Sequence, residues 1–138
     1  MKFSYKKIKT VNDAFKLRKV DIKKMPDVSM IPEHLQKHMI ANYKILIVAQ
    51  ALNTQEDGTV WQPDWSNTNE WKYQPYFQVQ TKKGNKVKTS GFGFSLTTCD
   101  SWSTFAITGS RLCFKTSEIA IYAGKQFKEL YQETHLIR

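Results

Sequence analysis

The sequence predicts an α+β fold in which an antiparallel sheet of about four to five strands packs against a long central helix and a C-terminal helix. Three observations lead to this prediction. Apolar residues follow helical spacing over residues 32–52 and again over residues 116–133, and short alternating runs separated by turn residues fill residues 72–114. The links between those runs are too short for a crossover helix, so we expect antiparallel pairing.

The first 24 residues predict a basic arm followed by a short helix. They contain nine Lys or Arg and two Asp, whereas the other 114 residues contain twelve Lys or Arg and ten Asp or Glu. Thr10 and Asp13 have the spacing of a capping arrangement, which predicts a short amphipathic helix that ends near Val20. The net charge of +9 therefore belongs mainly to one end of the chain.

The long helix is predicted from Pro32 to about Leu52. Proline suits the first helical position, and the apolar residues form one stripe in the first half of the segment. After Lys44 the segment becomes apolar nearly all round, so we expect this half to lie centrally in the fold. Residues 53–58 are turn formers and end the helix.

The strands are expected at residues 73–81, 86–96, 104–107 and 111–114. Pro75 indicates an edge position or a bulge in the first of them. Thr116 is the expected N-cap of the last helix, with Glu118 in its first turn. The residues predicted to be buried are Val48, Phe92, Phe94, Leu112, Phe114, Ala123 and Phe127.

Length and composition are those of a single domain, residues 1–138, that needs no disulfide or metal to fold. Cys99 and Cys113 lie in apolar runs without a CxxC spacing, so buried thiols in a reducing compartment are expected rather than a disulfide. The N-terminus has no apolar core of a signal peptide, and no apolar run approaches the length of a membrane span. We therefore expect a cytoplasmic protein that has no contact with a membrane.

Residues 61–77 contain three of the four tryptophans and no aliphatic residue. Residues 64–70 are turn formers, so this stretch is predicted to be a folded aromatic loop that leads into a strand at Lys72. Tryptophan and tyrosine in a loop are typical anchors of protein interfaces. The sequence therefore predicts a protein-binding site, whose residues are Trp61, Trp65, Trp71 and Tyr76.

An alternative is sequence-independent binding of single-stranded nucleic acid. Proteins of that kind combine a cationic track with aromatic rings on which bases stack. The residues that would supply the track and the ring are Lys82, Lys83, Lys86, Lys88 and Tyr73, together with the N-terminal lysines. The same lysines are also what a solvated hairpin tip looks like.

No catalytic residue, metal site or cofactor is predicted. Asp64, Glu70 and Lys72 match the letters of the PD…ExK nuclease signature, but five residues between the acids place both on one loop instead of adjacent strands. His34 and His38 are four residues apart on the long helix without an HExxH pattern. We expect a turn-capping Asp64, surface positions for Glu70 and Lys72, and surface histidines.

A family resemblance rests on WQPDWSN, on Glu70 with Lys72-Tyr73 and Pro75, on GFGFS, and on GSRLCFKTSEIAIYAGKQFKELY at residues 109–131. Over about residues 30–137 the chain resembles uncharacterised proteins carried by phages and prophages of gut Bacteroidales. The resemblance implies a phage or mobile-element origin and brings no catalytic residues with it. The expected role is a non-catalytic phage-type accessory protein that binds a virion component or a host factor, in the cytoplasm of an infected or lysogenic bacterial cell or on the virion.

Overall fold

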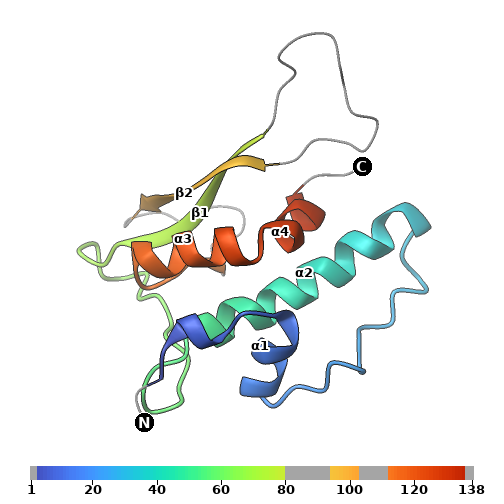
Figure 1. The fold of residues 1–138 in the computed structure, drawn as a ribbon, viewed down its shortest axis with the longest axis horizontal. Helices are drawn as coiled ribbons and strands as arrows, with labels where there is room; N and C mark the ends of the chain where they lie inside the picture. Colours follow the sequence, from blue (N-terminus) through green and yellow to red (C-terminus); the bar gives the residue numbers. More distant parts are fainter. Residues whose placement is uncertain (1–2, 80–93, 103–111, 136–138) are drawn as a thin grey trace, which may run out of the picture.

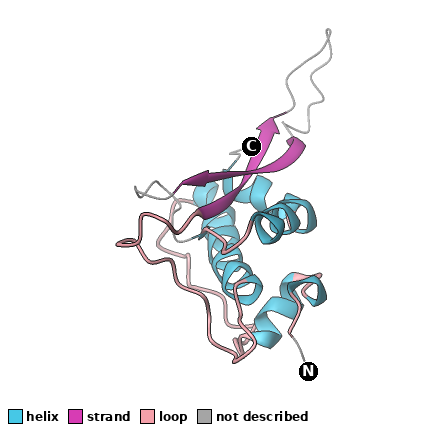
Figure 2. Ribbon diagram, turned by 90° about the vertical axis from the view of Figure 1, so that its left-hand side faces the viewer, coloured by secondary structure: helices cyan, strands magenta, loops and turns pink. Residues whose placement is uncertain are grey.

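The computed structural model describes residues 3–79, 94–102 and 112–135, and these form layers of helices beneath a pair of strands. The elements are η1 (Tyr5–Lys7), α1 (Val11–Leu17), α2 (Glu33–Leu52), β1 (Lys72–Val79), β2 (Phe94–Trp102), α3 (Ser117–Gln126) and α4 (Lys128–His135). In Figure 1 the strands lie on one side of α3 and α4, while α2 and α1 lie on the other side. Figure 2 shows the same order of layers from the side.

The predicted sheet of four to five strands is wrong. The described residues are mostly helical, and their only sheet is the antiparallel pair of β1 and β2, in which Lys72 faces Trp102 and Val79 faces Phe94. Phe114 forms a single bridge to Tyr73 through two backbone hydrogen bonds of 2.7 and 3.2 Å, after which the chain turns into α3. Of the strand expected at residues 111–114, the described residues 112–114 therefore show one bridge, at Phe114. The strand expected at residues 104–107 and the start of that expected at 86–96 lie outside the described residues.

The long helix is confirmed as α2, with Pro32 as its N-cap. Its buried positions follow helical spacing and include Ala41, Ile45, Val48 and Leu52, none of which is more than 5% exposed. Ile45, Val48 and Leu52 pack in one apolar cluster with Phe114 and with buried residues of α3 and α4. No helix in the described ranges is long and apolar enough to cross a membrane.

The C-terminal helix is present, but it is interrupted where one continuous helix was expected. Thr116 is its N-cap as predicted, since its hydroxyl accepts a 3.2 Å hydrogen bond from the Ile119 amide. At Phe127 the backbone leaves helical geometry (φ −112°, ψ 28°), and α4 begins at the next residue. The break leaves the Phe127 ring inside the core, where it is 4% exposed.

The N-terminal residues are packed on the body of the protein. The predicted cap of α1 is a complete capping box, in which the Thr10 hydroxyl accepts from the Asp13 amide and the Asp13 carboxylate accepts from the Thr10 amide. Ile8 is buried in the main core, and α1 adds Ala14 and Phe15 to the interior. The helix ends at Leu17, and the positive φ of 55° at Lys19 turns the chain away.

The core prediction is largely confirmed where the structure describes it. Val48, Phe114 and Ala123 have no exposed surface, and Phe127 is nearly as deeply buried. Leu112 is partly buried against this cluster. Phe92 and the side chain of Phe94 lie outside the part of the chain that the structure describes.

Candidate functional site

The aromatic loop, residues 61–71, folds around the side chain of Lys72. This lysine has no exposed surface, in contrast to the surface position that the sequence predicted. Its ammonium group donates hydrogen bonds to the backbone carbonyls of Asp64 (2.9 Å), Glu70 (3.0 Å) and Asn67 (3.3 Å). The Glu70 carboxylate lies 3.6 Å away, and the Trp65 ring centroid lies 5.3 Å from the same nitrogen. The loop therefore surrounds a buried cation with oxygen atoms and an aromatic ring.

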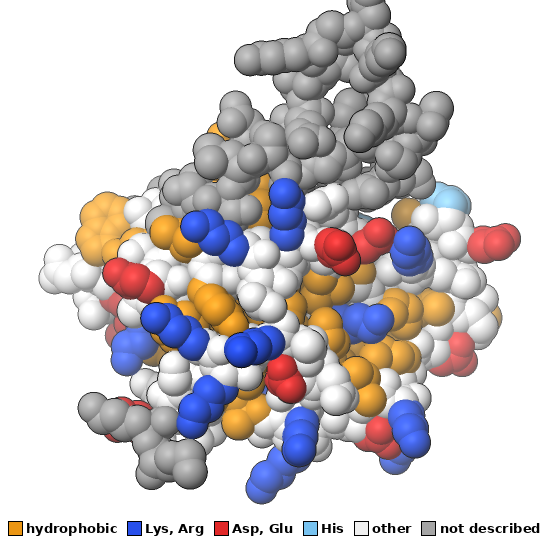
Figure 3. Space-filling view, in the orientation of Figure 1, with side chains coloured by type: hydrophobic (Ala, Val, Ile, Leu, Met, Phe, Trp, Pro, Cys, Tyr) orange, Lys and Arg blue, Asp and Glu red, His pale blue; other side chains and the backbone are white. Residues whose placement is uncertain are grey.

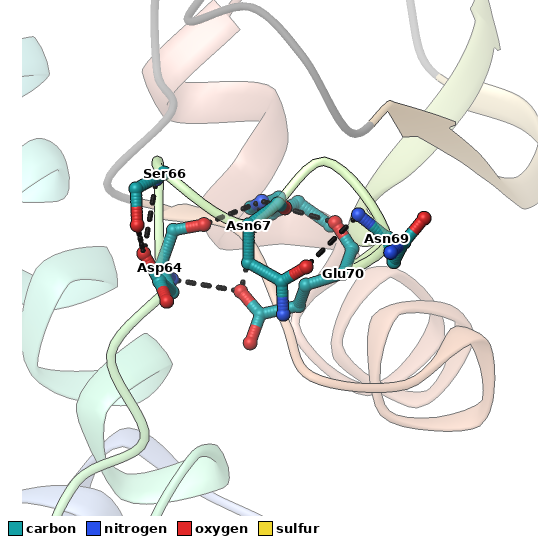
Figure 4. Close-up of polar contacts among 6 residues, drawn as sticks. Asp64, Ser66, Asn67, Asn69 and Glu70 are labelled. Atoms are coloured by element: carbon teal, nitrogen blue, oxygen red, sulfur yellow. Dashed lines mark hydrogen bonds and ion pairs between the residues drawn. The ribbon is translucent and has the colours of Figure 1, made fainter.

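The turn residues of the loop hold one another through short-range hydrogen bonds, which Figure 4 shows. The Asp64 amide donates to the Glu70 carboxylate at 2.8 Å, which closes the loop across six residues. The Asp64 carboxylate in turn accepts from the Ser66 hydroxyl and amide, and these bonds hold the pKa of Asp64 below its usual value. The Asn67 side chain accepts from the Asn69 amide at 3.0 Å. Asp64 thus caps a turn, as predicted.

The tryptophans of the predicted protein-binding set point in different directions. Trp61 is 9% exposed and packs with Cys113 in a small apolar cluster. Trp65 is 44% exposed, and Trp71 and Tyr76 are each 53% exposed. Trp61 therefore anchors the loop to the body, while the other three rings remain accessible to a partner.

A cavity of about 580 Å³ separates the aromatic loop from α2. Trp61, Trp65 and Pro63 line it from the loop, and Leu46, which is 42% exposed, lines it from α2. Its polar lining consists of uncharged side chains, including Gln50, Asn53 and Gln62. The exposed side of the loop is therefore continuous with an uncharged recess that has both polar and apolar lining.

The side chains of the nuclease signature, Asp64, Glu70 and Lys72, form hydrogen bonds and an ion pair within the loop. The Lys72 ammonium is enclosed by three carbonyl groups and has no surface from which to support an attacking water. The Glu70 carboxylate binds the Asp64 amide and faces the same ammonium, and the Asp64 carboxylate caps Ser66. The geometry supports a structural role for all three residues.

The residues of the nucleic-acid alternative are only partly described. Tyr73 is partly buried against the main core and bridges Phe114 through its backbone. Its ring is therefore engaged in packing. Lys82, Lys83, Lys86 and Lys88 lie outside the described residues.

The remaining candidate residues do not converge on a site. The described chain contains no group of three or more His, Cys, Asp or Glu side chains placed to share a metal ion. His34 is exposed, and the ring of His38 forms a 3.1 Å hydrogen bond with the Glu133 carbonyl. Cys113 is a buried free thiol, as predicted, and burial raises its pKa to about 11. A thiol with that pKa is a poor nucleophile near neutral pH.

Sequence reasoning missed the lysine that organises the loop. Lys72 was predicted at the surface because lysine is rarely buried. Its position immediately after an aromatic loop rich in turn residues is the one signal in the sequence, because such a loop presents many backbone carbonyls at close range.

Comparison of the chain with protein-family models, curated proteins and solved structures found no match.

Proposed function

We propose that this protein is a non-catalytic binding module whose aromatic loop docks on a protein partner. The observation that carries the proposal is the exposure of Trp65 and Trp71 on a loop that is fixed internally by Lys72, together with the exposure of Tyr76 on the strand that follows. Tryptophan and tyrosine supply most of the binding energy in many protein interfaces. The cavity beside Trp65 offers an uncharged recess for an apolar side chain of the partner.

The internal bonding of the loop favours binding because it reduces the entropy lost on association. A loop that must be ordered on binding loses about 0.5–1.5 kcal/mol for each side chain that is immobilised. Here the backbone from Asp64 to Glu70 is already held by hydrogen bonds to Lys72 and within the loop. The rings are therefore presented in a defined arrangement before any partner arrives.

The resemblance to phage and prophage proteins supports the class of partner. An accessory protein of that origin acts on a virion component or on a factor of the infected bacterium. The buried, protonated Cys113 and the structural use of Asp64, Glu70 and Lys72 agree with a role without catalysis.

The test compares the wild type with the double variant Trp71→Ala/Tyr76→Ala. Both rings are half exposed, so their removal is expected to leave the free energy of unfolding nearly unchanged. Pull-down from infected cells followed by mass spectrometry identifies partners, and calorimetry with the purified partner measures the affinity. We expect the double variant to bind at least about thirtyfold more weakly, because an aromatic anchor contributes about 2 kcal/mol or more.

The matched control is the double variant Met30→Ala/Met39→Ala, which removes two exposed apolar side chains elsewhere on the surface. It is expected to bind the partner like the wild type. Equal affinity of the aromatic variant and the wild type would refute the proposal. So would the release of every captured component by nuclease, because the partner would then be a nucleic acid.

A further inference from the structure

The N-terminal segment is fixed to α3 along its length. The Tyr5 and Tyr122 rings meet edge to face at 5.2 Å, and the Tyr122 hydroxyl donates to the Ile8 carbonyl at 2.8 Å. One turn later, the Gln126 amide donates to the Lys9 carbonyl at 2.7 Å. This segment is therefore part of the folded surface, and its lysines extend from a fixed backbone.

This packing places four exposed lysines on neighbouring elements. Lys6 and Lys9 are exposed on the segment itself, and Lys16 is exposed on α1, about one helical turn after Asp13. Lys125 is exposed on α3, three residues after Tyr122, on the same side of the helix as the packed segment. We call these four residues, Lys6, Lys9, Lys16 and Lys125, the basic layer.

No salt bridge between described residues involves the basic layer, and Asp13 is the carboxylate that acts electrostatically on one of its members, Lys16. The two ion pairs among the described residues join Lys37 to Glu133 and Lys72 to Glu70. The nearby Asp13 carboxylate accepts the amides of Lys9 and Thr10 as part of the α1 cap. Figure 3 shows Lys and Arg side chains at the lower left of the view, over the N-terminal elements, and others across the rest of this face.

The surroundings of the layer distinguish between anionic partners. A protein segment that inserts into a membrane surface buries apolar side chains that lie beside its lysines. The large apolar side chains that are exposed in the described chain all belong to other segments, namely Met30, Met39, Leu46, Trp65, Trp71 and Tyr76. The basic layer instead has lysines on a fixed backbone and no large exposed apolar side chain. Such a surface suits the phosphate backbone of a nucleic acid, where each lysine–phosphate contact releases a condensed counterion.

We propose that the basic layer binds the phosphate backbone of a nucleic acid without reading its bases. This surface is separate from the aromatic loop, so one protein would hold a protein partner and a nucleic acid at two different sites. The inference does not depend on the proposed function of the loop. Its failure would leave that proposal intact.

The experiment measures fluorescence anisotropy of short labelled oligonucleotides, single-stranded and duplex, between about 50 and 200 mM salt. The wild type is compared with K6Q/K9Q/K16Q/K125Q and with the charge-matched control K24Q/K37Q/K44Q/K128Q, whose lysines lie elsewhere. The wild type is expected to lose about a hundredfold in affinity over this salt range if four phosphates are contacted. The layer variant is expected to bind about tenfold or more weakly at the lowest salt, with a shallower salt dependence, while the control resembles the wild type.

Equal losses in the layer and control variants would overturn the proposal, because only net charge would then matter. A loss confined to K82Q/K83Q/K86Q/K88Q would also overturn it, since the site would then lie on the other lysine cluster. Polyglutamate serves as a probe for an acidic protein. Tight binding of polyglutamate without binding of either oligonucleotide would assign the layer to an acidic protein and reject nucleic acid.

Discussion

A lysine side chain without exposed surface determines the conformation of the aromatic loop. A buried ammonium group costs several kcal/mol unless hydrogen bonds and an opposite charge compensate for the lost water. At Lys72 the compensation comes from carbonyls of Asp64, Asn67 and Glu70 and from the Glu70 carboxylate. These groups can converge only if residues 64–70 fold back on themselves, so the burial of one charge enforces the turn.

Lys72→Met is expected to lower the free energy of unfolding by about 3 kcal/mol. Methionine fills a similar volume, but it removes the donor that three loop carbonyls share and leaves the Glu70 carboxylate without its cation. Urea denaturation followed by tryptophan fluorescence measures the change. Lys37→Met, at a side chain that is 81% exposed, is the control and should change stability by less than about 0.5 kcal/mol. A result for Lys72→Met as small as the control would contradict the role given to this lysine.

The orientation of the tryptophans could not be predicted from their spacing. Trp61, Trp65 and Trp71 lie in one irregular loop, where neither helical nor strand periodicity assigns a side chain to a face. Trp61 is buried because Cys113, more than fifty residues later in the chain, lies against it. Long-range contacts of this kind leave no local pattern.

At the level of elements, the helices were predicted well because their signals are local. The helix α2 begins one residue after Pro32 and ends at Leu52, within one residue of the prediction. The caps at Thr10 and Thr116 were recognised from residue type and spacing. The break between α3 and α4 was missed because the residue at the break is Phe127, which is not a helix breaker. The packing of the Phe127 ring in the core accounts for the position of the break.

Phe127→Ala is expected to destabilise the protein by about 3–5 kcal/mol. The ring is 4% exposed in the main core, and it stands at the junction that lets α4 follow α3 around that core. Thermal or chemical unfolding monitored by circular dichroism gives the change. Met39→Ala removes an apolar side chain that is 43% exposed and should cost well under half as much. A loss below about 1 kcal/mol for Phe127→Ala would mean that the ring is not a core residue.

The strand prediction failed because alternation does not reveal which segments pair. Residues 111–114 form an apolar, strand-like run, yet the described part meets β1 through a single bridge at Phe114. The N-cap at Thr116 starts α3 two residues later, which leaves no length for a ladder. Helical periodicity reports on one segment, whereas a sheet requires the relative placement of several.

At the scale of the whole molecule, carboxylates stabilise many of the chain reversals. Hydrogen bonds from nearby amides and hydroxyls lower the pKa of five acidic groups, namely Asp13, Asp27, Asp57, Asp64 and Glu118. Asp13 belongs to the cap of α1, the carboxylates of Asp27, Asp57 and Asp64 each accept an amide two residues later in a turn, and Glu118 lies in the first turn of α3. A lowered pKa in the folded state means that the ionised form stabilises the fold above the ordinary pKa, and that this contribution is lost as the pH falls.

We therefore expect the melting temperature to be nearly constant from neutral pH to about 5 and to fall below about pH 4. Circular dichroism melts at a series of pH values measure this profile. Asp64→Asn should melt at a lower temperature near neutral pH and should show a smaller further decrease in acid, because the titrating group is absent. A melting temperature that rises as the pH falls below 4 would contradict the lowered pKa values of these five acidic groups.

Many irregular loops take their shape from a bound metal ion that several backbone carbonyls and a carboxylate surround. The loop at residues 64–70 has the same arrangement of oxygen atoms, but its central cation is covalently attached to the chain as the Lys72 side chain. An ammonium group of this kind cannot be exchanged, diluted or chelated. The conformation of the aromatic loop therefore does not depend on which metal ions surround the protein.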